Sequence, residues 1–372
     1  MIKALKVGII GLGHLGRYHA EKVAQISLAG LRMTERGLGM TERSLGCMSS
    51  FSPHRLSPKG SSFTPEMAKE KSVETSQVEL KAICDINEER LEEVANLLLK
   101  GYGLKPFKTK IFEEVLPLVD AVIVATPTFT HYEIVKKALL EGKAVLVEKP
   151  LTADINEAKD LIKLAEEKAL ILQVGYVERF QRVVEELCRR VKDPIFIEAH
   201  RIGSFTERNL DIDVVLDLMV HDLDLLFLFK NPQDLEFIHA VGAPVFTEKP
   251  DIVNARLVFK DGTTCNLTAS RISLSKQRKF RVFAKGAYFR VDTLEKSLVQ
   301  VLVDQKKRDY RIERLHFPDD DPLLKEVVAF VKAVVGMAEP RVQAKETLAS
   351  LEVALRIKAE VETNLKRLSA YL

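Results

Sequence analysis

The sequence has few cysteines, no long hydrophobic run and almost no excess of charge of one sign. Its four cysteines lack C-x-x-C spacing, which argues against a disulfide framework and a zinc site and favours a reducing compartment. No segment reaches the ~18–20 consecutive apolar residues of a membrane span. The apolar stretch in MIKALKVGII is too short for a signal peptide. These absences predict a cytoplasmic protein with no membrane partner.

The charge balance also limits the class of partner. The formal net charge is +3, from 56 Lys and Arg against 53 Asp and Glu, which is too small an excess to indicate nucleic-acid binding. Hydrophobic residues make up 46% of the chain, enough for a sizeable core. A length of 372 residues suggests two or three domains. We therefore expect a globular protein that acts on a small molecule.

Strand-like and helix-like segments alternate in the first part of the chain, which predicts a parallel, doubly wound α/β sheet of the Rossmann type over residues 1–176. The expected strands cover residues 5–10, 78–85, 120–127, 143–150 and 170–176. From residue 193 onward, strand-like pairs joined by short turns predict a mostly antiparallel, open sheet. With helices expected near 212–230, 321–336 and 343–369, residues 177–372 form a predicted α+β domain.

Residues 28–76 interrupt the alternation. They are rich in Ser, Thr, Gly and Met and contain two near-identical heptapeptides, MTERGLG and MTERSLG, at residues 33–46. A repeat of this length is too short for a solenoid, and the segment lacks sustained periodicity. We interpret it as an irregular, mobile insert, with a docking segment as the alternative.

The first turn carries the spacing G-x-G-x-x-G. Gly11, Gly13 and Gly16 in GLGHLG follow a strand and open a helix, the arrangement that brings a dinucleotide pyrophosphate to free N–H groups. Such units place an acidic residue about 20 positions later to bind the ribose. Asp85 reaches that separation once residues 28–76 are removed, whereas Glu35 follows no good strand. A glycine-rich turn without a ligand is the alternative.

Asp85 also bears on the choice of cofactor. Its charge would repel a 2′-phosphate, and no arginine follows it immediately, since Ile86 and Asn87 come next. This favours NAD over NADP. In ATPTFTHYE, Thr126, Pro127 and Thr128 follow another predicted parallel strand and are expected to line the cofactor path.

His131 in the same segment is expected to begin a helix close to the site, with a plain helix-terminal role as the alternative. VEKPLT, at 147–152, places two charged residues at the end of an apolar strand. A solvated charge pair is one interpretation of Glu148 and Lys149. The other is a lysine beside the nicotinamide, which would lower the pKa of a substrate hydroxyl and stabilise the alkoxide. Pro150 would fix the direction of the chain.

The segment DVVLDLMVHDLDLLFLF, at 213–229, contains an aspartate and a histidine four residues apart. On a helix, Asp217 could orient the ring of His221 and support its protonated form, which makes His221 a predicted general base. A satisfied helix histidine is the alternative. Neighbouring aspartates suggest a metal site, but only one histidine is nearby, so we predict no metal.

Together, GLGHLG, EKP at 148–150, VGYVERF at 174–180 and DLMVHDLD at 217–224 resemble the Gfo/Idh/MocA oxidoreductase family. The resemblance covers nearly the whole chain outside residues 28–76. It implies that the Rossmann domain binds NAD(P), that the second sheet serves oligomer contacts, and that Lys149, Asp217 and His221 are catalytic. The expected cofactor-binding residues are Gly11, Leu12, Gly13, His14, Leu15, Gly16, Asp85, Ile86, Thr126, Pro127, Thr128, His131, Glu148 and Lys149.

A narrower resemblance rests on GLGHLGRYHAEK, VGYVERFQ and DIVNARLVFKDGTTCNLTASRIS. These segments are similar to a subgroup that oxidises the 3-hydroxyl of UDP-N-acetylglucosamine, whose ketone feeds an aminotransferase in lipid A biosynthesis. Arg179 and Arg201 could grip a phosphate through forked hydrogen bonds, with surface ion pairs as the alternative. The expected substrate-binding residues are Lys149, Tyr176, Arg179, Arg201 and His221.

The predicted function is therefore NAD-dependent oxidation of a sugar hydroxyl to a ketone, by a homodimer or homotetramer assembled through the second sheet. Dehydrogenation of an inositol or a free aldose is the enzymatic alternative. A non-catalytic NAD-binding regulator and a scaffold acting through residues 28–76 are the alternatives from other classes.

Overall fold

The computed structural model describes residues 4–29, 78–206 and 212–370. The first sheet contains six parallel strands in the order β3-β2-β1-β4-β5-β6. Every residue of β4 and β5 is buried, and all are apolar except Glu148 at the end of β5, as expected where helices cover both faces. The strands are β1 (Leu5–Ile10), β2 (Val78–Cys84), β3 (Phe107–Thr109), β4 (Ala121–Val124), β5 (Ala144–Glu148) and β6 (Leu172–Gly175).

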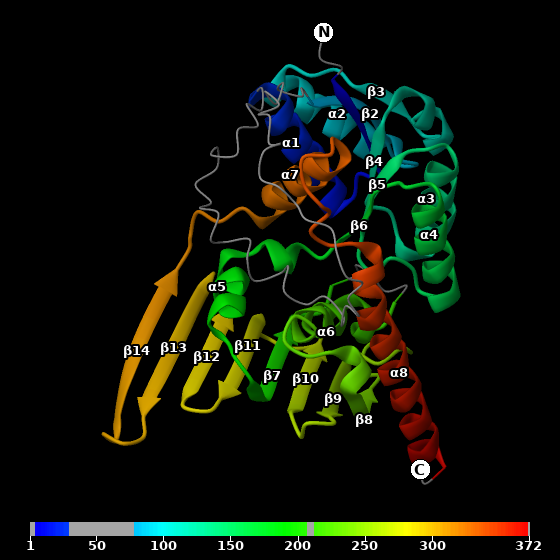
Figure 1. Ribbon diagram of the computed structural model, residues 1–372. Helices are drawn as coiled ribbons and strands as arrows, with labels where there is room; N and C mark the ends of the chain where they lie inside the picture. Colours follow the sequence, from blue (N-terminus) through cyan, green and yellow to red (C-terminus); the bar gives the residue numbers. More distant parts are fainter. Residues whose placement is uncertain (1–3, 30–77, 207–211, 371–372) are drawn as a thin grey trace, which may run out of the picture.

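Helices cover both faces of this sheet (Figure 1). Helices α1 (His14–Ala29) and α2 (Glu88–Tyr102) lie on one face, and α3 (His131–Leu140) and α4 (Ile155–Glu167) on the other. The strand order reverses direction between β1 and β4. In such sheets the ligand crevice opens beyond the carboxyl ends of the strands at this switch point. The predicted Rossmann architecture is confirmed.

The second sheet has eight strands in the order β14-β13-β12-β11-β7-β10-β9-β8, and only the β7–β10 pair is parallel. This confirms the predicted, mostly antiparallel sheet. Its strands are β7 (Pro194–Ile202), β8 (Leu235–Ala243), β9 (Ile252–Phe259), β10 (Thr264–Ser270), β11 (Gln277–Ala284), β12 (Ala287–Asp292), β13 (Ser297–Asp304) and β14 (Asp309–His316).

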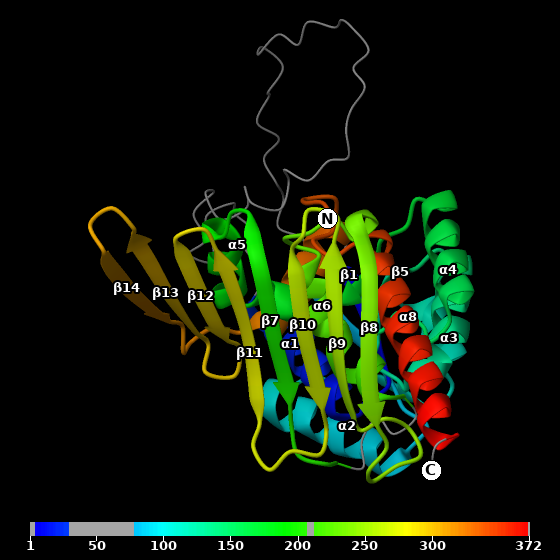
Figure 2. The same cartoon turned by 90° about the horizontal axis from the view of Figure 1, so that it is seen from below.

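Helices cover one face of this sheet and leave the other face open (Figure 2). The covering helices are α5 (Arg182–Arg190), α6 (Val220–Leu226) and α8 (Ala344–Ser369). Buried and more exposed residues alternate along β9, as expected for a strand with one covered face.

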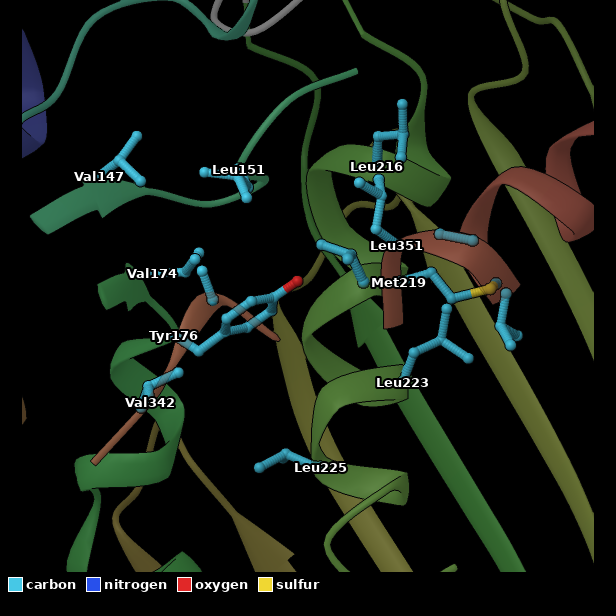
Figure 3. Packing of buried hydrophobic residues seen from close by; sticks show 14 of the residues in the cluster. Val147, Leu151, Val174, Tyr176, Leu216, Met219, Leu223, Leu225, Val342 and Leu351 are labelled. Carbon is cyan, nitrogen blue, oxygen red and sulfur yellow. The ribbon is translucent and has the colours of Figure 1, made fainter. Parts of the chain in front are cut away.

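One hydrophobic core joins the two sheets. Val147 and Leu151 from the end of β5 and Tyr176 from the end of β6 belong to the same buried cluster as Leu216 and Met219 beside α6 (Figure 3). This packing places the tip of the first sheet against the helix that covers the second sheet. The two predicted catalytic segments are therefore brought together by apolar burial.

Several elements differ from those expected. The predicted helix at 212–230 is a π-helical turn, Val215–Met219, followed by α6. Strands β3 and β8 and helix α5 were not predicted. Helix α7 (Pro322–Val334) follows the second sheet in the chain but packs against α1. The domain division at residue 176 stays a prediction, and residues 30–76 of the predicted insert lie outside the described residues. Among those described, no helix is both long and apolar enough to cross a membrane.

Candidate active site

The glycine turn leaves no room for side chains at two of its three glycines. Gly11 has φ of +86°, and a Cβ there would lie 2.6 Å from the carbonyl oxygen of Ala125. A Cβ on Gly16 would lie 1.8 Å from the carbonyl oxygen of Gly11. A Cβ on Gly13 would meet nothing nearer than Arg90, at 4.0 Å, so this side of the turn is open to a ligand. These positions fit the close backbone approach that a pyrophosphate requires.

Asp85 lies beside this turn, as the shortened spacing predicts. Strand β2 pairs with β1, and the carboxylate of Asp85 accepts hydrogen bonds from the N–H of Leu12 at 2.7 Å and of Asn87 at 2.8 Å. The guanidinium of Arg90 is 3.5 Å from the same carboxylate. Arg90 was not predicted, because it stands five residues after Asp85 and not directly behind it.

The other residues expected to bind the cofactor near the glycine turn differ in their exposure to solvent. The side chain of Leu12 is in the hydrophobic core, so only its backbone faces the turn. His14 and Leu15 are exposed at the start of α1, and Ile86 is exposed beyond β2. Exposed residues at these places can contact a dinucleotide, whereas the side chain of Leu12 cannot.

His131 braces the tips of two strands. One ring nitrogen lies 2.9 Å from the carbonyl oxygen of Thr126 and the other 2.9 Å from that of Pro150. The ring is buried, and burial lowers its pKa. Both ring nitrogens therefore face backbone carbonyls, and a neutral ring donates a hydrogen bond to one of them. In this place His131 positions the cofactor segment rather than contacting a ligand through its ring. In the same segment, Thr128 is buried and Pro127 is exposed.

Lys149 extends from the end of β5 to the π-helical turn, Val215–Met219, that precedes α6. Its ammonium donates hydrogen bonds to the backbone carbonyl of Asp217 at 2.7 Å and to its carboxylate at 3.2 Å. The lysine side chain is only 10% exposed, so this ion pair is largely shielded from solvent. The four-residue spacing had suggested His221 as the partner of Asp217, whereas the structure pairs Asp217 with Lys149.

His221 is buried and lies close to these groups. Its ring makes an edge contact with Tyr176, with centroids 6.1 Å apart, and its Nδ1 has no hydrogen-bond partner among the described residues. Burial lowers the pKa of His221 well below its usual value, and the charges of Lys149, Arg201 and Arg278 lower it further. A neutral imidazole can accept a proton. The expectation that Asp217 supports the protonated ring needs correction, because the surrounding charges favour the neutral form.

The two arginines expected to bind a phosphate, Arg179 and Arg201, are already bonded to carboxylates. Arg179 donates to both carboxylate oxygens of Asp224, at 2.7 and 2.6 Å, and it is buried. Arg201 donates to Asp222 at 3.0 Å and to Glu178 at 2.8 Å, and it is also buried. The structure therefore does not present either fork to a phosphate. These pairs hold α6 in place, and they account for two of the aspartates that suggested a metal.

Glu148 is turned toward a buried cluster. Its carboxylate lies 2.7 Å from the ring of His19, and a Cβ on Gly175 would lie 3.1 Å from its second oxygen. Glu326 of α7 completes the cluster. Among the described residues, these three are the one group of His, Cys, Asp or Glu side chains close enough to consider a metal, with ligand atoms within 4.8 Å of one another.

Known proteins resemble this chain in sequence and in structure. Residues 60–176 match the family model described as "Oxidoreductase family, NAD-binding Rossmann fold". UDP-N-acetylglucosamine 3-dehydrogenase of Acidithiobacillus ferrooxidans is 32% identical over 295 residues, which are 79% of this chain and 76% of that protein. Myo-inositol 2-dehydrogenase of Thermotoga maritima is 27% identical over 305 residues, covering 76% of this chain and 89% of that one.

Two solved structures align with this chain along nearly its whole length. A structure of the Acidithiobacillus ferrooxidans enzyme aligns with a TM-score of 0.75 and 29% identity over 97% of this chain and 99% of that chain. Scyllo-inositol dehydrogenase of Lactobacillus casei, with bound NAD(H) and scyllo-inositol, aligns with a TM-score of 0.68 and 19% identity over 97% of this chain and 98% of that chain. The second likeness shows the fold alone.

Proposed function

Because the chain belongs to the Gfo/Idh/MocA oxidoreductase family, we propose that it uses NAD to oxidise the 3-hydroxyl of UDP-N-acetylglucosamine to a ketone. The observation that carries the proposal is that Lys149, at the end of β5, and His221, on α6, lie close together. Lys149 is bonded to Asp217, four residues before His221, and its charge acts on the imidazole. The similarity to UDP-N-acetylglucosamine 3-dehydrogenase supports the choice of substrate.

The chemistry follows from the charges. His221 is neutral, so its ring takes the proton of the substrate hydroxyl. The ammonium of Lys149 stabilises the negative charge that develops on the oxygen. When bound, the nicotinamide ring supplies the hydride acceptor. Asp217 pairs with the ammonium and fixes its position, and Tyr176 packs against the ring of His221.

The choice of NAD rests on Asp85. Its carboxylate is held by two backbone N–H groups beside the glycine turn, which leaves acceptor positions for the ribose hydroxyls. A 2′-phosphate placed there would meet a negative charge. Arg90, at 3.5 Å from this carboxylate, reduces the repulsion, so we expect preference for NAD rather than complete exclusion of NADP.

We propose that a second copy of the chain covers the open face of the eight-stranded sheet. This face carries an aromatic row in which Phe196 and Phe283 have ring centroids 5.4 Å apart, and Phe283 and Tyr288 are 4.9 Å apart. Phe237, 53% exposed, and Val241, 45% exposed, lie on β8 of the same sheet. Apolar residues on an uncovered sheet face are typical of an oligomer interface. Phe283→Lys should lower the mass measured by light scattering, whereas an unchanged mass would refute this interface.

The decisive test of function compares Lys149→Met with Lys163→Met, an exposed lysine of α4. With UDP-N-acetylglucosamine and NAD, we expect Lys149→Met to lower kcat by about 10²–10³-fold and to leave NADH binding nearly unchanged. The control should match the wild type. Normal turnover by Lys149→Met would remove the lysine from the mechanism.

The substrate is tested on the wild-type enzyme by the absorbance of the reduced cofactor. Activity on UDP-N-acetylglucosamine supports the proposal. Activity on myo-inositol or a free aldose, with none on the nucleotide sugar, would replace it with a cyclitol or aldose dehydrogenase. NADH binding without turnover of any sugar or cyclitol would indicate a regulator.

A further inference from the structure

Two arginines are direct neighbours on the second sheet. Arg278 of β11 is the register partner of Arg201 on the adjacent strand β7. Alternation along β11 puts Arg278 on the same face as Phe280, whose side chain is buried beneath the covering helices. Like charges directly opposite each other on neighbouring strands destabilise a sheet. A cross-strand arginine pair at this place therefore needs compensation by negative charge.

Among the residues that the structure describes, only one member of the pair has a directly bonded carboxylate. Arg201 is bonded to Asp222 and Glu178. In the part of the chain that the structure describes, Arg278 has no hydrogen-bonded carboxylate, and the charges of Glu178, Asp222 and Asp217 act on it only from a distance. It is half-buried, so solvent compensates it only in part. Burial and the charge of Arg201 both lower its pKa.

The guanidinium of Arg278 lies near the residues proposed to be catalytic. Its charge acts on the ring of His221, as does that of Lys149, and the carboxylate of Asp217 acts on Arg278 in turn. The side chain therefore lies within electrostatic range of both residues proposed to act on the substrate hydroxyl. A planar guanidinium whose donors have no carboxylate partner in the described parts of the chain matches the oxygens of a phosphate group. An anionic substrate would supply the hydrogen-bonded acceptor that Arg278 lacks among the described residues.

We propose that Arg278 binds a phosphate group of the substrate and makes the enzyme select phosphorylated sugars over free sugars and cyclitols. This inference rests on the proposed dehydrogenase function and deepens it by naming the group that is recognised. It gives Arg278 the role that sequence reasoning assigned to Arg179 and Arg201, whose guanidinium groups are held by carboxylates.

The experiment compares Arg278→Met and Arg278→Lys with Arg290→Met, which removes an exposed arginine from the neighbouring strand β12. Each protein is assayed with UDP-N-acetylglucosamine, N-acetylglucosamine 1-phosphate and free N-acetylglucosamine. Binding of UDP and of NADH is measured separately by calorimetry.

We expect Arg278→Met to raise KM for the phosphorylated substrates and the Kd for UDP by about tenfold to a hundredfold, the effect of losing a charge-assisted hydrogen bond. NADH binding should be unchanged, and any activity on the free sugar should not fall. Arg278→Lys should restore part of the UDP affinity, and Arg290→Met should behave as the wild type.

Two results would overturn the inference without touching the proposed function. The first is a wild-type enzyme that oxidises UDP-N-acetylglucosamine while Arg278→Met leaves KM and UDP binding unchanged. The second is an equal loss of activity on phosphorylated and free sugars in Arg278→Met, which would mean that Arg278 only positions the site. By contrast, a wild-type enzyme that binds NADH but oxidises no phosphorylated sugar would refute the proposed function itself.

Discussion

Glu326 offers a prediction in which the pH dependence of stability can be worked out from one buried carboxyl group. It lies on α7, it is fully buried, and neither of its carboxylate oxygens has a hydrogen-bond partner among the described residues. Burial raises the pKa of Glu326 well above its usual value, and the negative charge of Glu148 raises it further. The folded protein therefore holds this carboxyl in its protonated form at a pH where the unfolded chain has released the proton.

The sign follows from proton linkage. Above the ordinary pKa of 4.5, the unfolded chain binds fewer protons at this position than the folded protein does, so raising the pH favours unfolding. The free energy of unfolding keeps falling until the pH passes the raised pKa of Glu326 in the folded state. Each pH unit within this window lowers the free energy of unfolding by about 1.4 kcal/mol. The change from pH 5.5 to 7.5 therefore lowers it by up to about 3 kcal/mol.

Glu326→Gln keeps the shape of the side chain and removes the titrating proton. The free energy of unfolding is measured in urea for the wild type and this variant at pH 5.5 and pH 7.5. Between the two pH values, the variant should become more stable relative to the wild type by up to about 3 kcal/mol. Glu362→Gln, which changes an exposed glutamate of α8, should show no such change.

The reasoning fails if the difference between Glu326→Gln and the wild type is the same at both pH values, because Glu326 would then be ionised in the folded protein. Such a result, combined with a loss of wild-type stability in EDTA, would indicate that His19, Glu148 and Glu326 hold a divalent cation instead of a proton.

Two further predictions concern the cofactor and the reaction. Asp85→Ala should raise KM for NAD about tenfold while reducing the preference over NADP, because the ribose loses its acceptor and the 2′-phosphate loses its repulsion; an unchanged NAD to NADP ratio of kcat/KM would contradict this role. Because burial and nearby cations lower the pKa of His221, the acid limb of the pH profile of kcat/KM should lie below the ordinary value of 6.5, and a limb above that value would exclude His221 as the base.

The sequence predicts most of the first sheet because parallel strands buried on both faces produce continuous apolar runs. It also predicts the position of Asp85, since register and spacing place it beside the glycine turn once the insert is removed. The short strand β3 has only three residues and gives too few positions for a pattern. The packing of α7 on α1 joins segments that are far apart in the chain, so local periodicity carries no signal of it.

The charged residues of the site were harder to assign because their partners are distant in sequence. Arg179 and Asp224 are 45 residues apart, and Arg201 and Asp222 are 21 apart. Residue type alone identifies each arginine as a possible phosphate ligand, but only the fold shows which guanidinium is already paired. The sequence does give one indication of the place of Arg278. It stands two residues before the apolar Phe280, so in a strand both side chains point to the same, covered face.

The motifs of this chain therefore contain two kinds of charged residue with different physical demands. Asp222 and Asp224, on α6, are buried. Within the described ranges, removing Asp224 would leave Arg179 only the half-exposed Glu346, and removing Asp222 would leave Arg201 only Glu178. Losing one partner of a buried pair of this kind costs up to about 5 kcal/mol. Lys149 and His221 have a different environment, because an ion pair holds the lysine while the imidazole stays neutral with one ring nitrogen unbonded among the described residues. The paired residues hold α6 against its neighbours, and the neutral imidazole on the same helix can accept a proton.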